Sequence, residues 1–122
     1  MSLYPGSNPS FRASYEQELA RLRSDYVASS FRRTAALRAL LSGLPPEPVR
    51  PEEMEPLREA FHKIAGTAGI CGLDQVSARA REAERAILEL QDRRIGVDAP
   101  ILRLMAAAID SIEEAFAREA GR

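Results

Sequence analysis

The sequence predicts an all-α protein, an antiparallel up-down four-helix bundle preceded by a flexible N-terminal leader. Four long segments carry apolar residues at steps of three and four, the spacing of a helix that buries one face. Alanine, leucine, arginine and glutamate, which favour helices, are abundant, and no segment shows a strand pattern. Short turns after the second and third segments indicate that consecutive helices pack as antiparallel neighbours.

The composition predicts one soluble domain, with residues 1–13 as the leader and residues 14–122 as the bundle. The formal net charge of −1 offers no basic surface for nucleic acid or an anionic membrane. No apolar run approaches the roughly 20 residues that span a bilayer, and the start lacks a signal-peptide pattern. A single cysteine, Cys71, excludes an internal disulfide and fits a reducing compartment. We therefore expect a cytoplasmic protein without a nucleic-acid partner or direct membrane contact.

The first helix is expected over residues 15–42. Ser14 and Gln17 have the spacing of a capping box at its start, and Gly43 ends it. The leader before it, residues 1–13, contains prolines and glycine that favour a flexible segment.

The other three helices follow a loop at residues 44–51, where four prolines exclude a helix. The second helix is expected from near Glu53 to about Cys71, before a glycine that stops it. Asp74 and Asp98 are expected to cap the third and fourth helices, whose apolar stripes complete the core.

The only histidine, His62, is predicted on the exposed face of the second helix. A rotation of about 100° per residue places it near 140° from the core direction, which Phe61 and Ile64 define. Its expected neighbours on the exposed face are Arg58, Ala65, Gly66 and Gly69.

Two glycines near His62 require an explanation, because an interior helical glycine costs roughly 0.5–1 kcal/mol relative to alanine. Gly66 lies one turn after the histidine on the same face, and Gly69 follows nearby. A sequence rich in alanine has no folding reason to place glycine there. Clearance is a reason, since it lets the surface of another protein approach the imidazole.

Imidazole chemistry suits this arrangement. With an unperturbed pKa of about 6.5, a histidine is mostly unprotonated and nucleophilic at neutral pH. A nitrogen–phosphorus bond is energy-rich enough to pass its phosphoryl group to a carboxylate. The sequence shows neither a metal-binding carboxylate cluster nor a glycine-rich phosphate loop. We therefore expect no metal site in this chain and expect a partner to supply any magnesium and acid–base groups.

The run from His62 to Leu73 resembles the signature of histidine-containing phosphotransfer (HPt) domains. That signature has an aliphatic residue, a glycine and a small hydroxyl residue two, four and five positions after the histidine, then a glycine and an apolar residue at ten and eleven. The matching residues are Ile64, Gly66, Thr67, Gly72 and Leu73, and Ala83-Glu84 falls where the family usually has Leu-Glu.

The resemblance implies a phosphorelay module of two-component signalling. Such a domain accepts a phosphoryl group on its histidine, here His62, from a receiver-domain aspartate or a histidine kinase, and passes it to another receiver. It would be a carrier without autonomous catalysis, free-standing or part of a hybrid sensor histidine kinase, and the response-regulator receiver would supply Mg²⁺. Gly66 would give clearance for docking.

One position departs from the family pattern. The lysine usual three residues after the histidine is Ala65 here, so the cation expected to help hold the phosphate is missing. Arg58, one turn before His62, is the better substitute, because Lys63 would have to curl its stem around the helix.

The sequence also fits other interpretations. A degenerate HPt-like bundle would serve as a docking module that takes no phosphate, and the missing lysine at Ala65 keeps this interpretation open. A helical adaptor that dimerises through an exposed stripe is another interpretation, which an exposed apolar patch on the first helix would favour. Cys71 on the core stripe fits a buried structural thiol, and metal binding would need more than one histidine and one cysteine. Arg79 and Arg81 could ring a receiver-binding patch.

Overall fold

The structure is a computed structural model that describes residues 9–121. Its elements are α1 (Pro9–Ala28), α2 (Ser30–Ser42), the 3₁₀ turn η2 (Pro51–Met54), α3 (Glu55–Ile70), α4 (Asp74–Arg93) and α5 (Ala99–Ala120). Within the described residues the extended pairing is limited to an isolated bridge between Val49 and Val97. The prediction of an all-helical fold is therefore confirmed.

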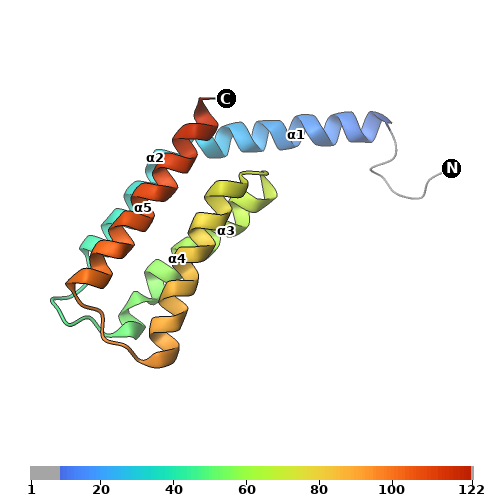
Figure 1. The fold of residues 1–122 in the computed structure, drawn as a ribbon. Coiled ribbons are helices and arrows are strands. Elements are labelled where there is room, and N and C mark those ends of the chain that lie inside the picture. Colours follow the sequence, from blue (N-terminus) through green and yellow to red (C-terminus); the bar gives the residue numbers. More distant parts are fainter. Residues whose placement is uncertain (1–8, 122) are drawn as a thin grey trace.

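The helices α2, α3, α4 and α5 pack together as the body of the molecule (Figure 1). The most extensive contact joins α3 to α4, while α5 packs on both α2 and α4, and α2 also contacts α3. The helix α1 projects away from the other four at the end where α2 begins and the C-terminus lies (Figure 1). None of the described helices combines the length and the apolar character needed to cross a membrane.

The first helix starts earlier than predicted. Residues 9–13, expected in the leader, form the beginning of α1. Pro9 is tolerated there because the first turn of a helix has no intrahelical use for an amide hydrogen. Ser14 is consequently inside the helix and is not its N-cap. The rest of the predicted leader, residues 1–8, lies outside the described residues.

The predicted continuous helix over residues 15–42 is also wrong, because Ser29 interrupts it between α1 and α2. The Ser29 hydroxyl donates a 3.0 Å hydrogen bond to the carbonyl of Tyr26, an interaction that bends helices. Tyr26 itself is buried and packs against Phe116 of α5, with ring centroids 5.6 Å apart. Packing on α5 therefore fixes the end of α1, and α2 leaves in a new direction.

The remaining helix ends lie close to their predicted positions. Gly72, with φ of +76°, adopts the left-handed conformation that ends α3. The Asp98 carboxylate accepts a 3.3 Å hydrogen bond from the amide of Ile101, which confirms it as the cap of α5. Asp74 is instead the first residue of α4 and makes no capping hydrogen bond.

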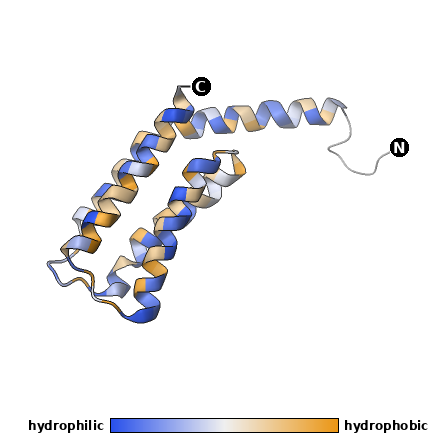
Figure 2. Ribbon diagram, viewed as in Figure 1, coloured by the Kyte–Doolittle hydropathy of each residue, from blue (hydrophilic) through white to orange (hydrophobic). Residues whose placement is uncertain are grey.

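The core lies among α2, α3, α4 and α5. Its largest fully buried side chains include Phe61 of α3 and Phe116 of α5. Every helix carries hydrophilic and hydrophobic residues (Figure 2), and the hydrophobic ones on α3, α4 and α5 supply most of the core. The opposite side of α3 stays open to solvent, and the histidine lies there.

Candidate functional site

His62 is on the exposed face of α3, as the helical rotation predicts, and 67% of its side chain is accessible. Its Nδ1 atom lies 2.8 Å from Oε2 of Glu84 on α4, within hydrogen-bonding distance. The Glu84 side chain is only 12% exposed. One edge of the imidazole is thus turned toward a shielded carboxylate, while the ring as a whole remains accessible.

Glu84 is a residue of this site that the sequence does not single out. The sequence places it in the family motif and on a solvated, charged face of its helix, and the second expectation is wrong because its side chain is shielded. It falls on the apolar stripe of α4, between Ala80 and Ile87, which are both fully buried. An acidic side chain on a core-facing stripe needs a partner, because an unpaired buried charge is costly. A glutamate on the apolar stripe of a helix is thus the sequence signal that could have identified Glu84.

Arg58 is the partner of Glu84 across the α3–α4 contact. Its Nη1 atom donates a 2.9 Å hydrogen bond to Oε2 of Glu84, and its Nε atom donates to Glu55. Glu55 also accepts a 3.1 Å hydrogen bond from Nε2 of Gln91 on α4. We call these residues, with His62, the polar chain, because contacts link them in the order His62, Glu84, Arg58, Glu55 and Gln91.

The hydrogen bonds of the polar chain shift the pKa values of Arg58 and Glu55. The hydrogen bond to Glu55 is the main reason that the pKa of Arg58 is raised, and both carboxylates add to this effect. Conversely, the hydrogen bond from Arg58 lowers the pKa of Glu55, with a smaller contribution from Gln91. The Arg58 guanidinium is therefore a permanent cation within the polar chain.

The two cations predicted near His62 both have other partners. Arg58 is engaged with two carboxylates. Lys63 is 75% exposed, and its Nζ lies 3.8 Å from Oε1 of Glu59 on the same helix. The structure thus connects Arg58 to the histidine through Glu84, whereas it directs Lys63 to a different carboxylate.

The prediction that Ala65 lies on the exposed face beside His62 is wrong. Ala65 is only 3% exposed. Its carbonyl accepts a 2.7 Å hydrogen bond from the hydroxyl of Ser77 on α4. The cause is the close packing of α4 on α3, which covers a wider sector of α3 than the apolar stripe alone indicates.

Restoring a lysine at Ala65 is therefore expected to destabilise the fold. A long side chain at this buried position must displace α4, at a cost of about 1–3 kcal/mol. Chemical denaturation of Ala65→Lys checks this, with Thr67→Lys at an exposed α3 position as the matched control. Equal free energies of unfolding for the two variants would show that position 65 has room for the lysine.

The two glycines have different surroundings. A Cβ atom built on Gly66 meets no atom within 4 Å outside the backbone of its own helix, so the space above it is open. A Cβ on Gly69 would lie 3.3 Å from the Ser77 hydroxyl, which is tight. Gly66 therefore leaves open space outside the molecule, whereas Gly69 allows the close approach of α4.

The remaining candidates have other surroundings. Arg79 donates a 2.7 Å hydrogen bond to the carbonyl of Ser111 on α5, while Arg81 is exposed on α4. Cys71 is a half-buried free thiol. Among residues 9–121, no three or more His, Cys, Asp and Glu side chains are grouped so that they could hold a metal ion.

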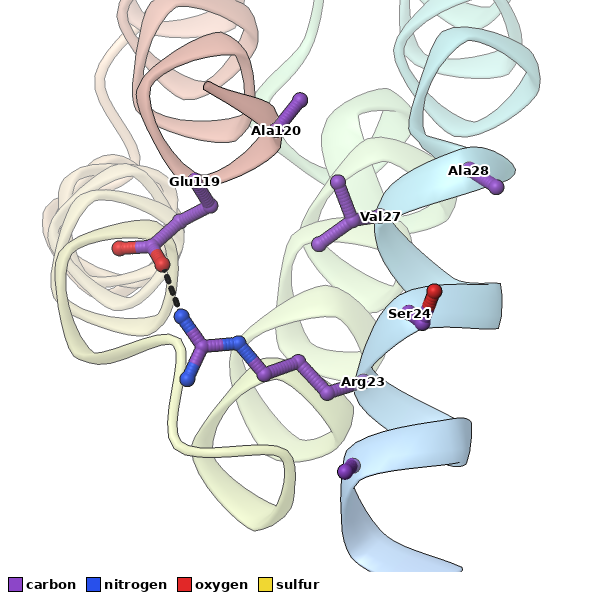
Figure 3. A pocket seen from close by; sticks show the side chains of 7 residues that line it. Arg23, Ser24, Val27, Ala28, Glu119 and Ala120 are labelled. Atoms are coloured by element: carbon purple, nitrogen blue, oxygen red, sulfur yellow. Dashed lines mark hydrogen bonds and ion pairs between the residues drawn. The ribbon is translucent and has the colours of Figure 1, made fainter. Parts of the chain in front are cut away.

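A pocket lies between the ends of α1 and α5 (Figure 3). Arg23 of α1 forms an ion pair with Glu119 of α5 across it, and Val27 lines it as well. It is lined by neither His62 nor any other member of the polar chain. The ion pair helps Tyr26 to hold α1 against the end of α5.

Comparisons with known proteins identify the family. Searches of curated proteins and of solved structures returned no match. The family model of the Hpt domain matches residues 11–115, from the first turns of α1 to near the end of α5. This range contains His62 and the whole polar chain, and it covers most of the 122 residues. The chain therefore belongs to the Hpt domain family, whose members carry phosphoryl groups on histidine in phosphorelays.

Proposed function

We propose that this Hpt domain accepts a phosphoryl group on Nε2 of His62 and passes it to a receiver domain. The donor is the phosphorylated aspartate of another receiver or a histidine kinase, in a two-component phosphorelay. The observation that carries the proposal is the exposed imidazole with its Nδ1 atom 2.8 Å from the shielded carboxylate of Glu84. In the proposed antiparallel up-down order of α2 to α5, the site lies on α3 and α4, along one side of the bundle.

The contact with Glu84 determines which ring nitrogen reacts. A carboxylate beside Nδ1 favours the tautomer that carries its proton on Nδ1, which leaves the lone pair on Nε2. In the transfer, Nε2 attacks phosphorus, the nitrogen–phosphorus bond forms, and the bond from phosphorus to the aspartate oxygen breaks. The aspartate leaves as a carboxylate, and the ring retains its Nδ1 proton.

Glu84 also stabilises the charge that develops. As Nε2 donates its lone pair, the imidazole becomes positively charged, and a nearby carboxylate in a shielded position lowers the energy of that state. We propose that the receiver supplies Mg²⁺ and the leaving carboxylate, and that this chain acts as a carrier without catalysis of its own.

The docking face is proposed to lie around Gly66. The open space above this glycine allows a receiver to approach His62 along α3. Ile70, one turn further, is 73% exposed and offers an apolar contact at the end of the helix. We propose that this protein is cytoplasmic, which the free thiol of Cys71 supports.

A docking module that takes no phosphate is the second candidate. Tyr15 and Leu22 on α1 are 55% and 46% exposed, and such apolar residues on a projecting helix favour an adaptor. An adaptor would bind receivers without becoming labelled.

Phosphoryl transfer from receivers tests the proposal. The protein is incubated with Mg²⁺ and a panel of receiver domains that were charged with acetyl phosphate, and its acid-labile label is located by mass spectrometry. We expect label on His62 and none on His62→Gln. Absence of label on the wild type, or equal label on the variant, would refute phosphoryl transfer, and binding without label would support the adaptor.

A further inference from the structure

We infer that Arg58 is a positioning residue, which acts through Glu84 to hold the His62 ring with Nδ1 inward and Nε2 outward. It does not serve as the cation that binds the phosphoryl group. The inference rests on the proposed function, because orienting the ring matters only if His62 is phosphorylated. The orientation itself can be measured without any phosphoryl transfer.

The first argument is that one oxygen of Glu84 serves both partners. Oε2 lies 2.8 Å from Nδ1 of His62 and 2.9 Å from Nη1 of Arg58. The side chains of Glu84 and Arg58 are 12% and 21% exposed, so water screens this pair poorly. Without the guanidinium, the carboxylate would lose this hydrogen bond and would be free to turn toward solvent.

The second argument is the shape of the guanidinium. Its planar fork holds Glu84 through Nη1 and Glu55 through Nε, and two hydrogen bonds in one plane restrict rotation. Glu55 is in turn held by Gln91, which belongs to α4. Arg58 is therefore fixed from both sides, and the Glu84 oxygen is presented to His62 in a defined place.

The two possible roles of Arg58 affect different states of the protein. A phosphate-binding cation would change the lifetime of the phosphohistidine and leave the unmodified imidazole as it was. A positioning residue would change the tautomer of the unmodified imidazole. Because the chain contains one histidine, its ring signals are unambiguous in a nitrogen-15 NMR spectrum.

The experiment compares the wild type with Arg58→Met and Arg58→Lys at about pH 8.5, above the ordinary titration range of imidazole. The ring tautomer is measured by NMR, and the rate of His62 phosphorylation by phosphoramidate, a small donor, is measured by mass spectrometry. Arg38→Met is the matched control. Arg38 also bridges two carboxylates, Asp110 and Glu113 of α5, but on the α2–α5 contact.

Arg58→Met is expected to reduce the share of the Nδ1–H tautomer and to slow the phosphoramidate reaction about three- to tenfold. Arg58→Lys should fall between the wild type and Arg58→Met, because an ammonium keeps the charge but lacks the planar fork. Arg38→Met should leave both quantities unchanged. If Arg58→Met does not fold, Glu55→Gln, which frees one arm of the fork, should shift the tautomer in the same direction.

The inference is overturned if Arg58→Met has the tautomer of the wild type, or if Arg38→Met shifts it equally. A shortened phosphohistidine lifetime with an unchanged tautomer would assign Arg58 to the phosphate instead. Failure of the proposed function is a separate result, in which the tautomer responds to Arg58 but no receiver labels His62.

Discussion

Gly66→Leu is expected to slow phosphoryl transfer from a receiver domain by about 100-fold or more, while the protein stays folded. Outside the backbone of its own helix, no atom lies within 4 Å of a Cβ built on Gly66, so the leucine side chain starts into open space. It projects instead into the space one turn from His62, where it holds an incoming receiver away. Reactions of this kind lose about 100-fold when the reacting groups are misplaced by about 1 Å.

Two measurements separate docking from chemistry in this variant. The phosphoramidate reaction needs no protein partner, so its rate at His62 should stay within about twofold of the wild type. Thr67→Leu adds the same bulk at an exposed position of α3 that lies about 140° around the helix from His62, and it should transfer normally. Normal transfer from receivers to Gly66→Leu would contradict the clearance role of the glycine.

Glu84→Gln is expected to slow phosphorylation of His62 about 10- to 100-fold, with phosphoramidate and with receivers alike. Glutamine has nearly the same shape, but it is neutral and does not stabilise the positive charge that the ring acquires. It can also turn its NH₂ group toward Nδ1, which would favour the unreactive tautomer. The effect belongs to the chemical step, so it should appear with both donors.

Glu82→Gln is the control for this substitution, since Glu82 is an exposed carboxylate on the same helix. It should react at the wild-type rate. Circular dichroism and thermal unfolding show whether Glu84→Gln keeps the fold, because Arg58 loses its charged partner there. A folded Glu84→Gln protein that reacts as fast as Glu82→Gln would exclude a role for the Glu84 charge.

Helix positions followed from the sequence wherever the cause was local. The end of α3 at Gly72 and the cap of α5 at Asp98 depend on backbone conformation and on one short hydrogen bond, which neighbouring residues determine. The interruption of the first helix at Ser29 could not be predicted from the sequence. It accompanies the packing of Tyr26 on Phe116, which is 90 residues away along the chain, and no local pattern contains that contact.

The features of the site also separate into those that depend on one helix and those that depend on a neighbouring helix. The sequence by itself determined that His62 faces solvent and that Gly66 lies beside it, because both positions follow from the rotation of a single helix whose core face is marked by Phe61 and Ile64. The same rotation left Ala65 on the wrong side, since it does not show how much of the helix a neighbour covers.

Only the tertiary structure decided what the imidazole touches. The contacts of His62 and Arg58 with Glu84 join two helices, and they depend on the register and rotation of α4 against α3. Those quantities arise from side-chain packing over the whole contact, including the Ser77 hydrogen bond and the missing Cβ of Gly69. Helical periodicity fixes directions around one axis, whereas the distance between two axes is set by the atoms that pack between them.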